Sequence, residues 1–192
     1  MENINVLMAA HREMESERIL LRPVSWDDAE DMYEHTSDEE TTRFIFEQHQ
    51  DLNQTKRLIA NYFLKEPVGK YAIVLKESRK MIGTIEFRVH EWNKSGELGY
   101  TLSRHFWGHG YMTEAGKLIL GLAFNVLGLE RVYAESDVRN EASVKLMNRL
   151  GMTHEGTLRR NHMLNGVLND SVHYSILKEE YVPSGHTAGR KS

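Results

Sequence analysis

The sequence predicts a single mixed α/β domain of the α+β type, built on a central, mostly antiparallel and twisted sheet flanked by helices. Apolar residues follow strand and helix periods in the order β α α β β β α β α β β. Short polar turns join the three consecutive strands in the middle, which favours antiparallel pairing. A long helix then leads to another strand, which is typical of a β-α-β crossover.

The first third of the chain predicts one strand and two helices. Ile19–Val24 (ILLRPV) has the composition of a strand and contains a proline that ends it. Ser25 can cap a following helix over 25–36, whose first turn is acidic, as the helix dipole favours. A second helix is predicted over 52–64, because its apolar residues recur at helical spacing until a proline and a glycine follow.

The middle of the chain predicts three strands and the crossover helix. KYAIVLK (70–76) and MIGTIEFRVH (81–90) are separated by a short polar turn typical of a hairpin, and ELGYTLS (97–103) follows. A helix over 113–127 has its apolar residues on one face and ends before Gly128.

The last third predicts a strand over 131–138 and a helix from Asn140 that Gly151 closes. Two further β runs lie on either side of Asn165-Gly166, a pair typical of a tight hairpin turn. We therefore expect a domain over 17–182, preceded by an N-terminal extension (1–16) and followed by a flexible polar tail (183–192).

Composition excludes several classes of function. With a net charge of −4 and no cysteine, the chain has neither the basic character typical of nucleic-acid binders nor any means of forming disulfides or thiolate metal sites. The ten histidines show no metal-ligand spacing, so no metal is expected. Neither a membrane-spanning run nor a secretory signal is evident, which predicts a cytoplasmic protein without membrane partners. A monomer and a homodimer both remain open.

The stretch FWGHGYMTEA (106–115) indicates an anion site. A strand followed by a glycine-containing turn and a helix presents free backbone N–H groups at the helix start, where the dipole is positive. The G-x-G-x-x-G fingerprint fails because its third glycine position is Thr113, and a Walker loop fails because Gly116-Lys117 precedes Leu118. From the glycines alone, a tight turn without a ligand is an equal alternative.

Longer segments resemble a known family. ELGYTLSRHFWGHGYMTEAGKLIL resembles the acetyl-CoA-binding segment of the GCN5-related N-acetyltransferases (GNAT). Together with NEASVKLMNRLGM and EGTLRRNHMLNGVLNDSVHYSI, it is similar to the RimJ/RimL branch, which acetylates the N-termini of ribosomal proteins. The resemblance covers about residues 17–181 and implies a sheet splayed around a β-α-β acetyl-CoA site.

The resemblance also implies which residues bind acetyl-CoA. Backbone groups of the strand hold the thioester, backbone amides of the turn and helix start hold the pyrophosphate, and Asn140 contacts the pantetheine arm. His105 stands where the family usually has Gln or Arg, and we expect it to act mainly through its backbone N–H. The residues implied are Tyr100, Thr101, Leu102, His105, Trp107, Gly108, His109, Gly110, Tyr111, Met112, Thr113, Asn140 and Ser143.

Acetyl transfer to a primary amine requires a base, because the amine is mostly protonated at neutral pH. His162 occupies the position of a Glu base in some members of the branch, and Glu97 is a competing base that would act through water. Ser143 matches a proposed proton donor to the leaving thiol, while Met147 stands where many other members have a tyrosine. Purely structural roles remain the alternative for His162, Glu97 and Ser143.

The resemblance implies an acetyl-CoA-dependent N-acetyltransferase whose acceptor is a primary amine, such as a protein N-terminus. The alternatives are a small amine (a polyamine, an amino acid or an aminoglycoside) and a non-catalytic CoA-binding sensor module. Acidic residues 38–40 could attract a cationic amine or be a solvated face. Aromatic residues could line the acceptor side or belong to the core: Trp26, Tyr33, Phe44, Phe46 and Trp92.

Overall fold

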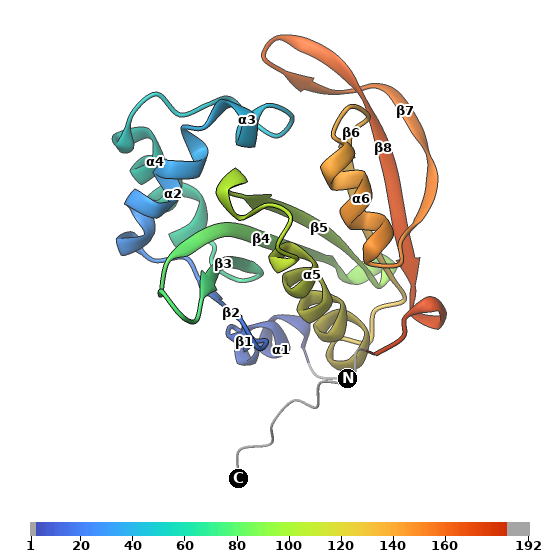
Figure 1. The fold of residues 1–192 in the computed structure, drawn as a ribbon. Coiled ribbons are helices and arrows are strands. Elements are labelled where there is room, and N and C mark those ends of the chain that lie inside the picture. The colour runs from blue at the N-terminus through green and yellow to red at the C-terminus, as the bar shows by residue number, and fades with distance from the viewer. Residues whose placement is uncertain (1–2, 184–192) are drawn as a thin grey trace.

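The computed structural model describes residues 3–183, and these form one eight-stranded sheet with helices on both faces (Figure 1). The strands lie side by side in the order β1-β2-β3-β4-β5-β6-β8-β7. Neighbouring strands pair antiparallel, except that β5 and β6 are parallel, as the predicted crossover requires. The strands are β1 (Met14–Glu15), β2 (Ile19–Pro23), β3 (Lys70–Leu75), β4 (Met81–His90), β5 (Ser95–Leu102), β6 (Arg131–Asp137), β7 (Thr153–Leu164) and β8 (Val167–Leu177).

Within residues 3–183, six α-helices pack around this sheet, and two of them continue as π-helical turns. The segment Ile59–Leu64 extends α4, and Leu122–Val126 extends α5. Short 3-10 turns include Trp26–Asp28 before α2 and Arg104–Phe106 after β5. The helices are α1 (Ile4–Ala10), α2 (Ala29–Thr36), α3 (Glu39–Thr42), α4 (Leu52–Leu58), α5 (Tyr111–Gly121) and α6 (Glu141–Arg149).

The alternation of side chains along β3 divides the apolar core into two layers. Tyr71 and Ile73 face the larger cluster, which contains buried residues of α1, α5 and α6. Ala72 and Val74 face the opposite cluster, beneath α2 and α4. Because successive strand residues point to opposite faces, β3, which is buried from Lys70 to Val74, can support helices on both sides.

The predicted element list is correct in order but lacks the short helix α3 and the elements at the N-terminus. Residues 1–16 were expected only as an extension, yet α1 and β1 lie there and the side chain of Met8 is 3% exposed. The first predicted helix begins with a 3-10 turn, and α5 begins at Tyr111 rather than at 113. The expected tail begins at Pro183, and its other residues lie outside the described part of the chain.

The predicted hairpin is confirmed at Asn165-Gly166, where both residues have positive φ (51° and 73°). This conformation suits a two-residue turn between twisted strands. None of the helices within residues 3–183 has the length and apolar character needed to cross a bilayer.

Candidate active site

The functional cleft arises where two parallel strands separate. β5 and β6 pair only from Ser95 with Arg131 to Glu97 with Tyr133, and then diverge (Figure 1). A cleft of about 1010 Å³ opens beyond this point, lined by residues of β5, β6, α3, the first two turns of α5, one face of α6, and β7. From Leu98 onward, the edge of β5 that faces β6 has no strand partner among the described residues.

The structure brings nearly all residues implied by the sequence to this one cleft. His105 and His109 are the exceptions, because neither lines it. The residues that do are Glu97, Tyr100, Thr101, Leu102, Trp107, Gly108, Gly110, Tyr111, Met112, Thr113, Asn140, Ser143 and His162.

The glycine turn has a backbone that other residues rarely adopt. Gly108 and Gly110 have φ values of 79° and 83°, in the left-handed region. Gly110 is the N-cap of α5, so the first backbone N–H groups of that helix lie at the cleft wall. A Cβ atom at Gly108 would meet no atom within 4 Å, which leaves room for a ligand to approach the backbone.

Arg18 fastens this turn to the sheet. Its Nη2 atom donates to the carbonyl oxygen of His109 at 3.0 Å, and its Nε atom donates to Glu114 at 2.6 Å. Arg18, Lys117 and Arg149 also line the cleft, so three cationic side chains lie around the glycine turn, of which Arg18 is paired with Glu114. Sequence reasoning missed these three, since they come from separate elements and share no motif.

A buried hydroxyl pair joins β5 to α6. The hydroxyl oxygens of Tyr100 and Ser143 are 2.6 Å apart. Burial is the main cause that raises the pKa of Tyr100 to about 12. Asn140 caps α6 by accepting a hydrogen bond from the Ser143 backbone N–H at 3.1 Å, so its Oδ1 atom already has a partner.

His162 faces an anchored carboxylate in the same cleft. Its Nε2 atom lies 3.6 Å from Oδ2 of Asp137, whose side chain is fully buried. Hydrogen bonds from Arg139 hold the pKa of Asp137 below its usual range. The Nδ1 atom of His162 is buried without a hydrogen-bond partner in residues 3–183. Nε2 is therefore the ring nitrogen available for proton exchange.

A bulge in β7 sets the direction of His162. The register with β8 shifts between Leu158 and His162, and Arg160 has a positive φ of 51°. Asp170 holds this bulge by accepting the Arg160 backbone N–H at 2.8 Å. Bulges commonly re-aim side chains next to active sites.

Glu97 also lines the cleft, but its carboxylate is engaged. Arg88 donates to Oε1 at 3.0 Å, and the Tyr133 hydroxyl lies 3.5 Å from Oε2. Met147, which stands where many other members of the family have a tyrosine, is fully buried in the core.

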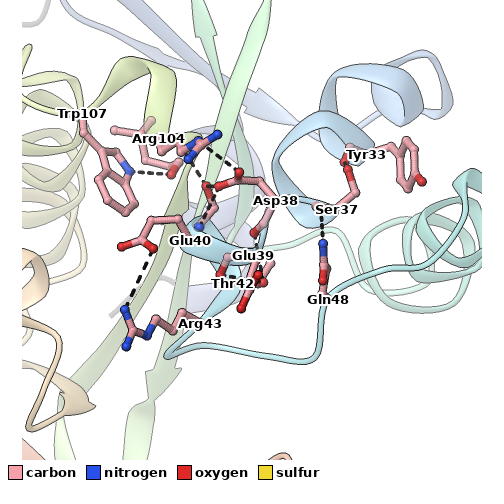
Figure 2. A network of polar contacts seen from close by, with 12 residues as sticks. Tyr33, Ser37, Asp38, Glu39, Glu40, Thr42, Arg43, Gln48, Arg104 and Trp107 are labelled. Atoms are coloured by element: carbon pink, nitrogen blue, oxygen red, sulfur yellow. Dashed lines mark hydrogen bonds and ion pairs between the residues drawn. The ribbon is translucent and has the colours of Figure 1, made fainter.

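A network of polar contacts joins α3 to the 3-10 turn that follows β5 (Figure 2). Asp38 caps α3 by accepting the Thr41 backbone N–H and lies 3.0 Å from Nε of Arg104. The indole N–H of Trp107 donates to the carbonyl oxygen of Leu102 at 2.7 Å. Of the expected acidic residues, Glu40 alone lines the cleft, so Asp38 has a structural role.

Phe44 is the one expected aromatic residue at the cleft. Trp92 is 97% exposed and Trp26 is 51% exposed, and neither lines it, nor do Tyr33 and Phe46. Within residues 3–183, no group of three or more His, Asp or Glu side chains could hold a metal ion.

Comparisons with known proteins agree with this geometry. The family model described as "Acetyltransferase (GNAT) domain" matches residues 18–153. The chain belongs to the GNAT acetyltransferase family. The "Uncharacterized N-acetyltransferase p20" of Bacillus licheniformis is 32% identical over 171 residues, which cover 86% of this chain and 96% of that protein. As a family member the chain is an N-acetyltransferase, and acetyl-CoA is its acetyl donor.

Two other relatives carry names that mention acceptors. The "Putative ribosomal N-acetyltransferase YdaF" of Bacillus subtilis is 37% identical over 89 residues, covering 46% of this chain and 49% of that protein. The "Spermidine N(1)-acetyltransferase" of Escherichia coli (strain K12) is 22% identical over 173 residues, covering 90% and 92%.

Solved structures confirm the GNAT fold. An acetyltransferase of the GNAT family from Bacillus anthracis superposes with a TM-score of 0.79 at 24% identity, covering 88% of this chain and 99% of that one. The microcin C7 self-immunity acetyltransferase MccE, solved with acetyl-CoA and AMP, gives a TM-score of 0.75 at 22% identity, covering 84% and 93%.

The residues present fit acetyl-CoA. The open backbone at Gly108 and the N-terminus of α5 suit a pyrophosphate, and the nearby cationic side chains add favourable charge. The unpartnered edge of β5 can pair with the amides of an extended pantetheine arm.

Proposed function

We propose that the chain acetylates the N-terminal α-amine of a polypeptide at the cleft between β5 and β6. One observation carries this choice: near Phe44 and Asn140 the cleft adjoins a second groove, of about 620 Å³. Residues of α3, the start of α6 and the β7–β8 hairpin line it. An extended acceptor has room there beyond its reacting amine, which a small amine does not need.

His162 is the base in this proposal. Its Nε2 atom takes the proton that the amine loses, and the carboxylate of Asp137 stabilises the imidazolium that forms. The 3.6 Å separation is too long for a direct hydrogen bond, so Asp137 acts mainly through its charge. Glu97 is less suited, because protonation would break its ion pair with Arg88.

The strand and the two helix starts hold the acetyl donor. Backbone N–H groups of 100–102 on β5 polarise the thioester carbonyl, and the turn over 105–113 binds the pyrophosphate. The Ser143 hydroxyl, in the first turn of α6, donates a hydrogen bond to the leaving sulfur, which departs as a stabilised thiolate and takes its proton from solvent. Acetyl-CoA supplies the activated acetyl group, and these residues orient it beside His162.

The partial likeness to YdaF, whose name mentions ribosomal acetylation, supports a polypeptide acceptor. A small polyamine is the second candidate acceptor. Four acidic side chains line the cleft away from the glycine turn and would attract a polycation. A relative is also named a spermidine acetyltransferase. The four acidic side chains are Glu40, Glu97, Glu135 and Asp137.

A single assay separates the candidates. The chain is incubated with acetyl-CoA and a panel of peptides with free N-termini, polyamines, amino acids and aminoglycosides, and the products are identified by mass spectrometry. We expect acetylated peptide α-amines together with released CoA. Peptides blocked by N-terminal formylation are the matched controls and should remain unmodified at that position.

Two results would overturn the proposal. Acetylation confined to polyamines would make the small amine the acceptor. CoA binding without release of CoA in the presence of any amine would favour a sensor module.

A further inference from the structure

The side chain of Tyr100 has no role in the function proposed above, where Tyr100 contributes only its backbone. Its hydroxyl forms a pair with that of Ser143, between β5 and α6. The pair lines the cleft where the strand that is to hold the thioester faces the first turn of α6. Ser143 is 6% exposed, and within residues 3–183 its Oγ atom has Tyr100 as its one hydrogen-bond partner.

The direction of this hydrogen bond follows from chemistry. A phenol is a stronger donor than an aliphatic alcohol, and the Tyr100 hydroxyl has no other acceptor in residues 3–183. Tyr100 therefore donates to Ser143 Oγ. Burial keeps this phenol protonated, since the pKa of Tyr100 is raised to about 12. The serine proton is then free for a third partner in the cleft.

We propose that Tyr100 is a positioning residue, whose phenol O–H fixes the Ser143 hydroxyl so that its proton points at the leaving sulfur of coenzyme A. This inference rests on the proposed role of Ser143 as donor. Many other members of the family have a tyrosine hydroxyl where this chain has Met147. Here the side chain of Tyr100, on β5, supplies a phenol near the leaving sulfur instead. Without Tyr100, Ser143 would turn its proton to a backbone carbonyl of its own helix, as serines in helices commonly do.

The ionisation of the thiol of bound CoA tests this without turnover. A hydrogen-bond donor aimed at the sulfur stabilises the thiolate. The thiol of bound CoA should therefore ionise at a lower pH in the native chain than in a variant that lacks this donor. Ultraviolet absorbance of the thiolate near ~240 nm is followed from about pH 6 to pH 9.5, with desulfo-CoA as the blank. We expect Ser143→Ala to raise the ionisation midpoint by roughly half to one pH unit, the size of one hydrogen bond.

Tyr100→Phe removes the hydroxyl and keeps the ring, and it should raise the same midpoint. In the Ser143→Ala background it should add nothing, because the two groups act as one unit. Tyr71→Phe is the matched control, since Tyr71 on β3 also has a phenol whose pKa is raised by burial to about 12, but it does not line the cleft. Its midpoint should equal that of the native chain.

Charged neighbours stay constant in all variants, so they do not affect the comparison: Glu97 on β5, Lys117 on α5, Arg149 on α6, Asp137 on β6 and His162 on β7. An unchanged midpoint in Tyr100→Phe would overturn the inference, as would an equal shift with and without Ser143. The assay needs no acceptor amine, so its failure is distinct from failure of the proposed acceptor.

Discussion

At the scale of single residues, His162 and Glu97 are the two candidates for the base that accepts the proton of the amine, and their surroundings differ. His162 Nε2 faces a carboxylate locked by Arg139, whereas Glu97 shares its charge with Arg88. We expect His162→Ala to lower kcat by about 100-fold or more, the usual contribution of a general base. Acetyl-CoA affinity should be unchanged, because β7 lies apart from the glycine turn. Steady-state kinetics and calorimetry measure the two effects.

Glu97→Gln is the comparison variant for this prediction. It should lower kcat much less, because it keeps the size of the side chain and removes only an engaged carboxylate. If kcat at neutral pH is unchanged in His162→Ala and falls in Glu97→Gln, the base role moves to Glu97.

Gly110 gives the second prediction at this scale. Valine is strongly disfavoured at its φ of 83°, and the added side chain would enter the cleft wall at the N-cap of α5. We expect Gly110→Val to abolish acetyl-CoA binding in calorimetry. Gly128→Val is the matched control: its φ is 64°, it lies beyond the other end of this helical segment, and its Cβ would meet nothing within 4 Å.

Gly128→Val should bind acetyl-CoA normally despite similar backbone strain. Normal binding by Gly110→Val would refute the phosphate site at this turn.

The glycines of the turn, Gly108 and Gly110, could be predicted from the sequence because their signal is local. Arg18 could not, since it reaches Glu114 across 96 residues of chain and only the folded sheet brings them together.

At the scale of elements, the period of the apolar residues predicted where the helices lie, but not which hydrogen-bonding pattern, α or π, each segment has. The apolar face of 113–127 is continuous through the change from α to π geometry at Leu122, so the pattern does not reveal that change. The start of α5 was placed two residues late, because Gly110 is an N-cap by its conformation and not by a capping side chain. α1 was missed because it is short and contributes few buried side chains.

An ion pair that spans β8 gives the prediction for the hairpin. Arg131 on β6 pairs with Glu155 on β7, and Ser175 on β8 donates to Glu155 at 2.8 Å. Hydrogen bonds from Arg131 are the main cause that lowers the pKa of Glu155 from 4.5 to about 2. This pKa is depressed in the folded state, so the stabilisation is present above about pH 4.5 and is lost as pH falls toward 2.

Glu155→Gln should therefore lower the free energy of unfolding at pH 7 by no more than about 1 kcal/mol, because the pair is partly exposed. The difference from the native chain should shrink at pH 3. Urea unfolding at both pH values measures it, with the exposed Glu179→Gln as control. A constant difference at the two pH values would contradict the ion-pair explanation.

At the scale of the whole molecule, the sheet consists of two parts joined by three residue pairs between β5 and β6 and by the α5 crossover. The sequence predicted the order of β2 to β8 along the chain, but not that β8 lies between β6 and β7 in the sheet. The divergence of β5 and β6 did not follow from periodicity, because a strand that loses its neighbour keeps the same alternation of side chains; only the family resemblance implied it. The position of His162 beside Asp137 was equally invisible, since it depends on the bulge in β7.

The two-part sheet predicts where acetyl-CoA should stabilise the fold. Hydrogen exchange should slow at 98–102 of β5, at 108–113 and in the first turn of α6, because these amides border the cleft on both sides. The turn at 165–166 should exchange unchanged. At a ligand concentration of about 100 times Kd, the free energy of unfolding should rise by about 2.7 kcal/mol. Uniform protection over the whole sheet, or protection confined to β6–β8, would contradict a ligand bound between the two parts.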